Sequence, residues 1–332
     1  MQPHDLPTFS VVIPTHNRPR QLKRCLAALA AQDYPRDRFE VIVVDDASPK
    51  PLHSLVDAMQ DRIRARLIRQ KRNAGPSAAR NAGAAHAQGR LIAFTDDDCA
   101  ADPGWLRAFA NALVSHPDNL HGGRVVNALH DNFFAATSQL IHDTGHAHFN
   151  VDPTDATFFA SNNMACAKSA LFAAGGFDES FRASEDRELC DRWRRRGGKL
   201  SFVPDAIIQH AHDLTLRRFW RQHFSYGQGA WRYHAARAAF ANPSRRTGLL
   251  GLTFRPDLTF YTRCLRAAVN HSTPRGAFAQ ALLIGVWQVA NTSGFFWERL
   301  HAPGCAKGRV IGASAAVAAP GTECEGSISE SQ

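Results

Sequence analysis

This sequence of 332 residues lacks the paired cysteines that mark two common kinds of stabilised domain. No Cys-x-x-Cys pair occurs, and the seven cysteines form an odd number at wide spacings. Structural zinc sites and disulfide frameworks both use cysteines at short, regular spacings. We therefore expect neither, and we expect the thiols to be buried and reduced in a reducing compartment.

Long apolar segments are missing as well. No uninterrupted apolar run reaches the roughly 20 residues that a membrane-spanning helix needs. Residues 1–10 also lack the basic start and following apolar stretch of a signal peptide. These absences predict a cytoplasmic protein, and a peripheral position at the inner face of the plasma membrane remains open.

The net charge is the least ordinary feature of the composition. Hydrophobic residues make up 44% and charged residues 21% of the chain, which is typical of a globular enzyme. The formal net charge is nevertheless +9, and residues 182–246 hold fourteen Lys and Arg against six Asp and Glu. This favours an anionic partner, such as nucleic acid, an anionic membrane surface or an anionic substrate. No nucleic-acid-binding motif accompanies the charge, so we expect no nucleic-acid partner.

Short apolar runs and helical patterns alternate along the first hundred residues. Residues 9–13, 40–44 and 91–94 are apolar and are predicted to be buried strands. Helical patterns lie between them, at 20–32 and 77–87. This alternation predicts an α/β fold with a mostly parallel sheet flanked by helices. Ligands of such sheets bind beyond the carboxyl ends of the strands.

The middle of the chain is less regular. Residues 131–155 are rich in His, Asp, Asn and Thr, and we expect a long loop or lid there. A strongly charged helix is predicted at 186–196, and a strand at 200–203 ends before Pro204.

Composition divides the chain into three parts. We predict a catalytic domain over residues 1–212, a helical region over 213–300 and a disordered tail over 301–332. Within the helical region, residues 278–300 are apolar with scattered polar side chains. Either a helix lying in a membrane interface or a helix packed on the protein would explain this pattern.

Six short motifs hold most of the polar residues that can carry chemistry. In chain order they are VVIPTHNR at 11–18, VIVVDDAS at 41–48, NAGPSAARNAGAAHAQG at 73–89, FTDDDC at 94–99, GGFDE at 175–179 and SEDRELCDRWRRRG at 184–197. In this order and spacing the chain resembles the family 2 glycosyltransferases over about residues 10–229. The resemblance implies a GT-A type, Rossmann-like fold with a nucleotide-sugar site, and the chain adds a helical C-terminal extension.

The acidic turn after the third predicted strand is the candidate metal site. A nucleotide sugar releases a diphosphate, and a hard divalent cation held by carboxylates can neutralise its charge. The resemblance implies that Asp98 binds Mn²⁺ or Mg²⁺ and that Asp96 faces the ribose or the metal. A late histidine, His210 or His212, would complete the site. A solvated turn of aspartates is the structural alternative.

The first strand-to-helix turns are candidates for binding the donor nucleotide. The resemblance assigns the nucleobase and ribose to Asp46 and to the turn after the first strand. Arg80 could reach the diphosphate or base, since its planar guanidinium suits phosphate. Helix caps and an ordinary helix face would use the same residue types, so that alternative stays open. The full candidate set is Pro14, Thr15, Asn17, Asp46, Asn73, Gly75, Arg80, Asp96 and Asp97.

The acidic pair Glu185-Asp186 is the candidate for catalysis. An inverting transfer needs a carboxylate that takes the proton of the acceptor hydroxyl as its oxygen attacks the anomeric carbon. The resemblance implies that Asp186 is this base and that Glu185 is its neighbour or an acceptor contact. Ordinary helix-start chemistry, with Ser184 as the cap, is the alternative.

The sequence therefore predicts an inverting glycosyltransferase that uses a nucleotide-diphosphate sugar in bacterial cell-surface glycan or glycolipid synthesis. The acceptor would be lipid-linked or a glycan. Residues 217–229 depart from the motif of processive polysaccharide synthases, which favours transfer of single sugars, with Arg221 and Tyr226 near the diphosphate or acceptor. The alternatives are a metal-dependent nucleotidyltransferase, or a basic protein without catalysis that binds nucleic acid or membrane.

Overall fold

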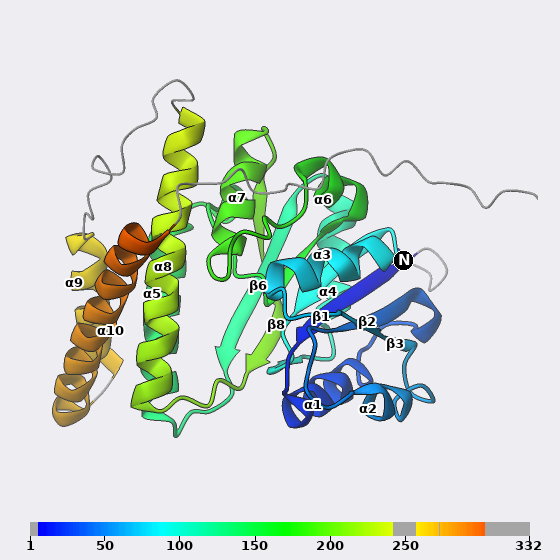
Figure 1. The fold of residues 1–332 in the computed structure, drawn as a ribbon, viewed down its shortest axis with the longest axis horizontal. Helices are drawn as coiled ribbons and strands as arrows, with labels where there is room; N and C mark the ends of the chain where they lie inside the picture. The colour runs from blue at the N-terminus through cyan, green and yellow to red at the C-terminus, as the bar shows by residue number, and fades with distance from the viewer. Residues whose placement is uncertain (1–5, 242–256, 272, 303–332) are drawn as a thin grey trace, which may run out of the picture.

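The computed structural model describes residues 6–241, 257–271 and 273–302, in which a sheet is flanked by helices and a further layer of helices stands beside it (Figure 1). The strands are β1 (Phe9–Thr15), β2 (Phe39–Asp45), β3 (Ala65–Arg69), β4 (Leu91–Thr95), β5 (Cys99–Ala101), β6 (Leu120–Asn127), β7 (Asn163–Ala167) and β8 (Leu200–His210). The helices are α1 (Pro19–Leu29), the 3-10 helix η2 (Arg36–Arg38), α2 (His53–Asp57), α3 (Pro76–His86), α4 (Trp105–Ser115), α5 (Phe133–Phe149), α6 (Lys168–Ala174), α7 (Glu185–Arg195), α8 (Leu216–Ala241), α9 (Leu258–His271) and α10 (Pro274–His301).

The sheet has the strand order β3-β2-β1-β4-β7-β6-β8-β5. Strands β3, β2, β1 and β4 are parallel, β7 is antiparallel to both β4 and β6, and β6 is parallel to β8. The short β5 pairs antiparallel with β8. The predicted α/β fold with a mostly parallel sheet is confirmed. The carboxyl ends of β1, β2 and β4 consequently meet at one edge.

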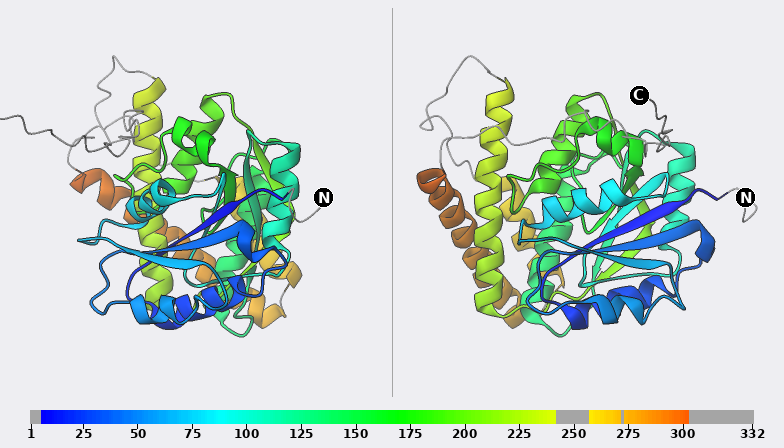
Figure 2. Two further views of the ribbon diagram at one scale, coloured as in Figure 1. Left: turned by 90° about the vertical axis from the view of Figure 1, so that its right-hand side faces the viewer. Right: turned by 45° about the vertical axis from the view of Figure 1, so that its right-hand side comes forward.

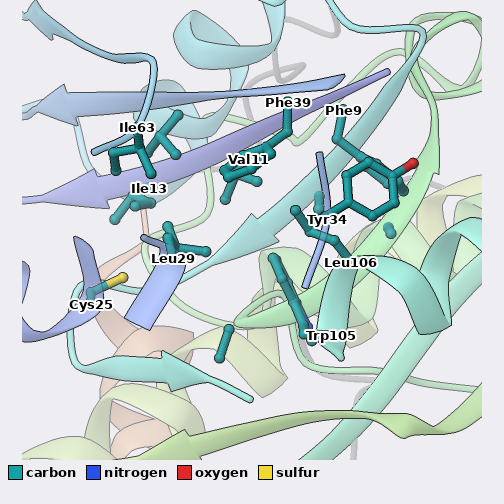
Figure 3. Close-up of a cluster of buried hydrophobic side chains, with 14 of the residues drawn as sticks. Phe9, Val11, Ile13, Cys25, Leu29, Tyr34, Phe39, Ile63, Trp105 and Leu106 are labelled. Atoms are coloured by element: carbon teal, nitrogen blue, oxygen red, sulfur yellow. The ribbon is translucent and has the colours of Figure 1, made fainter. Parts of the chain in front are cut away.

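Alternating side chains of β1 build a core on each face of the sheet, because successive residues of a strand point to opposite sides. Val11 and Ile13 pack into one apolar cluster with side chains of α1, α2 and α4. Figure 3 shows them near Leu29 of α1 and Trp105 and Leu106 of α4. This core holds α1 and α4 against one face of the sheet.

On the other face, α3, α6 and α7 cover a second apolar cluster that contains Val12 and Ile42. Helix α3 lies very close to the sheet, since a Cβ atom on Gly83 would come 2.4 Å from Cγ1 of Val12. The small residues of α3 therefore allow the helix to pack closely on the sheet. This close packing places Arg80, which is in the same helix, near the edge of the sheet where the strands end.

Helices α5, α8, α9 and α10 pack together beside the sheet, and the right view of Figure 2 shows α8 and α10 standing clear of it. A third apolar cluster joins them through Ile141 of α5, Phe219 of α8, Cys264 of α9 and Ile284 of α10. One face of α10 is thus packed on the protein, which was one of the two alternatives for residues 278–300. The opposite face of α10 is exposed.

The loop predicted at 131–155 is wrong, because residues 133–149 form α5. This helix buries only Ala135, Thr137 and Ile141, and its polar residues give it no clear apolar stripe in the sequence. Its stability comes from the side chain of Asn132, which caps its first turn, and from packing on α9 and α10. Because this stability comes from contacts with distant parts of the chain, the sequence of the helix itself gives little indication of it.

Two further differences concern the strands. β8 continues through Pro204 to His210, whereas the sequence predicted an end at 203. The pairing register of β6 with β8 shifts between Gly123 and Arg124, so that residues 204–206 are skipped in the ladder. A proline without an N–H group is accommodated at such a bulge.

The predicted boundary at 212/213 falls between the end of β8 and the start of α8. A division into separate domains there stays a prediction. The tail predicted at 301–332 lies outside the described residues, apart from its first two positions.

None of the helices in the described part of the chain has the length and apolar content needed to cross a membrane.

Candidate active site

A cavity of about 990 Å³ lies beside the acidic turn after β4 and the end of β8, and it extends between α5 and α8. Several residues singled out in the sequence line it together, and they are Arg80, Asp96, Asp98, Glu185, Asp186, His210 and His212. Other candidates do not line it but hold the adjoining turns, and they are Pro14, Thr15, Asn17, Asp46, Asn73, Gly75 and Asp97.

Backbone conformations that side chains disfavour concentrate at this edge. Among the described residues, the non-glycine positions with positive φ are Asn17 (55°), Ala47 (58°) and Ser184 (64°). Asn17 follows β1, Ala47 follows β2, and Ser184 precedes the acidic pair Glu185-Asp186. Conformations of this kind persist where the surrounding structure imposes them, as at many active sites. Ser184 makes no capping hydrogen bond with its side chain, so the helix-cap alternative for it has no support here.

The acidic turn after β4 is bound by residues from the first turn. Oγ1 of Thr15 donates to Oδ2 of Asp97 at 2.7 Å. Arg18 forms ion pairs with Oδ1 of Asp97 at 3.1 Å and Oδ2 of Asp98 at 3.0 Å. Burial raises the pKa of Asp97 to about 6 despite the charge of Arg18. Sequence reasoning did not single out Arg18, although it closes the first motif.

Asp98 also meets the end of β8. Nε2 of His210 lies 3.3 Å from Oδ1 of Asp98. Burial opposes ionisation of Asp98, but the hydrogen bond and charge of His210 hold its pKa well below the usual range. The ring of His212 lies 4.8 Å from that of His210, and burial with the charge of His210 lowers its pKa to about 4. Of the two candidate histidines, His210 is therefore the one that contacts the carboxylate.

The atoms of Asp98, Cys99 and His210 that could bind a metal ion lie within 4.8 Å of one another. Burial raises the pKa of the Cys99 thiol well above its usual value, so this sulfur stays protonated. Hard divalent ions prefer oxygen ligands and accept imidazole. The carboxylate of Asp98 and the imidazole of His210 thus fit Mn²⁺ or Mg²⁺. Asp96 is not part of this group.

Asp96 is instead held by Arg80, which is 3% exposed. Nη2 of Arg80 lies 2.7 Å from Asp96, and its Nη1 lies 2.8 Å from Glu185. The guanidinium also stands 5.5 Å from the ring of Phe177. Arg80 therefore joins the acidic turn after β4 to the acidic pair at the start of α7. Both of its terminal nitrogens are engaged by these carboxylates.

Asp46 organises the turn that begins α3. Its two carboxylate oxygens accept hydrogen bonds from the backbone N–H groups of Ala74 (2.7 Å) and Gly75 (2.8 Å). Gly75 has a φ of 92°, and the side chain of Arg182 lies against it. Nη1 of Arg182 donates to Oδ1 of Asn73 at 3.2 Å. Sequence reasoning missed Arg182, whose only signal is its position between the fifth and sixth motifs.

The turn after β1 is tied to the turn after β2. Pro14 pairs with Val44 of β2 and lies beyond Val12, the last residue of β1 that pairs with β4. The backbone N–H of Asn17 donates to Oγ of Ser48 at 2.8 Å. Nδ1 of His16 lies 2.7 Å from the carbonyl oxygen of Asp46. These contacts fix the backbone at the mouth of the predicted nucleotide site.

The carboxylate of Asp186 is positioned by backbone groups. Ser161 donates to it through its N–H at 3.2 Å, and Arg187 does so at 2.8 Å. Burial, followed by the charge of Glu185, raises the pKa of Asp186 to about 6. Such a carboxylate is ionised at neutral pH and basic enough to accept a proton.

The GGFDE motif forms a turn that α3 holds in place. Gly175 and Gly176 have φ values of 94° and 68°, which explains why glycine occupies both positions. The amide of Asn81 accepts from the N–H of Phe177 at 2.9 Å and donates to its carbonyl oxygen at 2.8 Å. Helix α3 therefore binds two segments, this turn and the acidic pair.

Similarity to known proteins bears on the family and the fold of the chain. Residues 10–173 match the family model described as Glycosyl transferase family 2. The chain belongs to this family. It is 30% identical over 225 residues to a pre-mycofactocin glycosyltransferase of Mycobacterium tuberculosis, a match that covers 67% of this chain and 46% of that protein. It is 31% identical over 237 residues to a chondroitin synthase of Escherichia coli, with 61% and 34% covered.

This family 2 chain thus spans less than half the length of these relatives. Its fold is similar to that of the mannosyltransferase PcManGT from Pyrobaculum calidifontis in complex with GDP-Man and Mn²⁺, with a TM-score of 0.60, 18% identity and 90% and 87% of the two chains covered. The structure of S. aureus TarS 1–349 with UDP-GlcNAc gives a TM-score of 0.51 at 15% identity, with 88% and 90% covered. These likenesses identify the fold as the predicted GT-A type.

Proposed function

We propose that this protein transfers a single sugar from a nucleotide-diphosphate sugar to an acceptor hydroxyl with inversion at the anomeric carbon. The observation that carries the proposal is the arrangement around one cavity. The Asp98–His210 pair lies on its wall, and the carboxylate of Asp186, poised near neutral pH, lies on the same cavity. A leaving diphosphate and an attacking hydroxyl both need such groups, on opposite sides of the sugar.

In this mechanism Asp186 acts as the base. Its carboxylate accepts the proton of the acceptor hydroxyl as that oxygen forms the new bond to the anomeric carbon. The bond to the diphosphate breaks with its electron pair, and the nucleoside diphosphate leaves. The transition state has oxocarbenium character, as in glycoside hydrolysis. Glu185, held by Arg80, keeps the adjoining backbone in place.

Asp98 and His210 would hold the divalent cation, with Asp96 near it or near the ribose. When bound, Mn²⁺ or Mg²⁺ supplies positive charge that stabilises the diphosphate as it departs. Asp46, Asn73 and Gly75 shape the turn that receives the nucleotide. The similar fold of PcManGT carries GDP-Man and Mn²⁺, which supports a nucleotide sugar and a metal here.

Donor binding can be tested by thermal unfolding. A ligand that binds the folded protein raises its melting temperature by mass action. We expect a rise with one of the UDP-, GDP- or dTDP-sugars in the presence of Mn²⁺, and a much smaller rise for Asp98→Asn. Asp205→Asn, in β8 away from the cavity lining, is the control and should behave as the wild type. No shift with any nucleotide sugar, in the presence or absence of metal, would contradict the proposal.

We further propose that the transfer serves cell-surface glycan or glycolipid synthesis at the cytoplasmic face of a membrane. The support is the outer face of α10, whose large apolar side chains are 40% to 78% exposed, and they are Phe278, Leu282, Val289, Phe296, Trp297 and Leu300. They recur at helical spacing along about 33 Å. Exposed apolar surface of this extent marks an interaction site.

The charges around this face suit anionic lipid. Helices α9 and α10 carry four arginines, Arg263, Arg266, Arg275 and Arg299, and a single acidic residue, Glu298, which is buried beside Arg232. An apolar helix face with arginines and no exposed acid is the pattern of helices that lie in a membrane interface. An anionic bilayer is therefore the occupant that we propose.

Vesicle sedimentation tests this part of the proposal. The wild type should be retained by phosphatidylglycerol vesicles at low salt, and Leu282→Glu should lose most of that retention. Val114→Glu, which changes an exposed apolar residue of α4, is the matched control and should still be retained. Failure of the wild type to bind, or a dimer that Leu282→Glu dissociates, would show that the face does not serve a membrane.

A further inference from the structure

The cavity continues beyond the catalytic groups as a groove between two helices. Most of its lining residues in α5 and α8 recur at intervals of three or four positions, so each helix presents one face to the groove. They include Gln139, His142 and His146 of α5 and Arg218, Arg221 and Tyr226 of α8. At about 990 Å³, the cavity is at the upper end of small-molecule sites and has room beyond a donor.

The groove contains cationic and neutral side chains but no carboxylate from either helix face. Arg218 is paired with Asp213 at 3.0 Å. Arg221, one turn further along α8, is exposed and has no hydrogen-bond or ion-pair partner in the described part of the chain. An arginine of this kind in a substrate groove is available for an anionic group.

Other groups of the groove are suited to a sugar. Tyr226 is 45% exposed, and its hydroxyl accepts a hydrogen bond from Gln222. The base Asp186 lines the same cavity as Tyr226. Burial also lowers the pKa of His146, so its ring is a neutral partner for hydroxyl groups.

We propose that this groove is the acceptor subsite and that it takes a sugar bearing a phosphate group. This inference rests on the proposed glycosyl transfer. Arg221 binds the phosphate, since a guanidinium pairs with phosphate oxygens through two parallel hydrogen bonds. The apolar face of the sugar lies on Tyr226, and its free hydroxyl reaches Asp186.

Two kinds of acceptor carry a sugar with a phosphate group: a soluble sugar phosphate and a sugar phosphate linked to a lipid. Phe260 of α9 and Trp287 of α10 also line the cavity, with their ring centroids 5.8 Å apart. A lipid chain leaving the phosphate would meet these apolar side chains. The experiment below separates the two sources.

Calorimetric titration provides the test, with the donor site kept occupied by Mn²⁺ and the nucleoside diphosphate that stabilises the protein most. The probes are glucose, N-acetylglucosamine and mannose, each against its 1-phosphate. We expect at least one phosphate to bind tenfold or more tightly than its neutral sugar. Arg221→Gln should abolish that difference, whereas Arg217→Gln, an exposed neighbour outside the groove, should preserve it. Binding of the nucleoside diphosphate should be equal in all three proteins.

Three outcomes would overturn the inference: no sugar phosphate binds more tightly than its sugar, the preference survives in Arg221→Gln, or Arg221→Gln weakens the nucleoside diphosphate instead. In each, nucleotide binding by the wild type leaves the proposed transfer standing. Absence of nucleotide binding by the wild type would remove the proposed function itself. Phosphatidylcholine vesicles with and without a polyprenyl-linked sugar phosphate then assign the source, since only a lipid-linked acceptor causes Arg221-dependent retention.

Discussion

At the scale of single residues, the site is built from charged side chains that reach partners in distant parts of the chain. Arg18 binds the turn after β4, Arg182 lies on the turn before α3, and Arg80 bridges Asp96 and Glu185. The sequence predicted the acidic residues because each follows a strand or precedes a helix. It could not predict their partners, since those contacts depend on which elements become neighbours.

Asp45 and Asp46 illustrate this limit. Both end the same predicted strand, and the sequence offers little to separate them. In the structure Asp45 is fully buried, with its oxygens bound by the N–H of Ser48 and by Arg69. Asp46 alone reaches the turn of Gly75. The direction of each side chain decides its role, and this direction follows from how the strand ends.

Arg80 should be the most important of these residues for stability. Arg80→Met would leave Glu185 buried without its cation, and such a loss costs about 3–5 kcal/mol. We expect the free energy of unfolding, measured by denaturant titration, to fall by about 3 kcal/mol, at the low end because Asp96 is partly exposed. Arg107→Met breaks an exposed pair and should cost less than about 1 kcal/mol. Equal losses in the two variants would show that the bridge is not a structural element.

At the scale of elements, apolar periodicity was a reliable guide where it was strong. The strands β1, β2 and β4 and the helices α1 and α3 lie where the pattern predicted them. β6 was missed because its sequence, LHGGRVVN, has two adjacent glycines and no regular alternation of apolar and polar residues. Its glycines are required by packing, since a Cβ on Gly122 would come 1.9 Å from the ring of Phe159. Helix α5 was missed for a similar reason, because its stability depends on packing against α9 and α10 and not on a local apolar pattern.

The contact between α8 and α10 makes an element-scale prediction. A Cβ on Gly294 would lie 1.9 Å from the carbonyl oxygen of Phe224, so Gly294→Ala should push the helices apart. Overpacking of this kind costs about 1–3 kcal/mol. Gly285→Ala is the matched control, because no atom lies within 4 Å of its new Cβ and alanine favours a helix by about 1 kcal/mol. Thermal unfolding should shift in opposite directions for the two variants, and a shared direction would contradict this packing.

At the scale of the whole molecule, the structure shows where the excess positive charge lies. It follows the acidic catalytic edge, beginning at α7 and continuing along α8, α9 and α10. The α8 face contributes Arg218 and Arg221 to the groove, and α9 and α10 carry four further arginines in the helical layer that includes the exposed apolar face. The composition indicated an anionic partner but could not choose among several. We propose that the helices provide two separate surfaces for anionic partners, one the acceptor groove and one the exposed apolar face of α10.

The central claim is that Asp186 is the base of a sugar transfer from a nucleotide sugar. The decisive measurement is nucleoside diphosphate release from the stabilising nucleotide sugar as the sugar passes to an added sugar phosphate or to water. It is followed as a function of pH for the wild type, Asp186→Asn and the control Asp191→Asn. Because the pKa of Asp186 is about 6, the wild-type rate should fall as pH drops below about 6 and the base is protonated.

Asp186→Asn should bind the donor normally but release product about 10²- to 10⁴-fold more slowly, since a general base contributes that factor. Asp191→Asn, which changes a carboxylate of α7 paired with Arg195, should retain the wild-type rate and pH profile. Retained turnover in Asp186→Asn, or release of pyrophosphate from a nucleoside triphosphate in place of nucleoside diphosphate from a nucleotide sugar, would contradict the account.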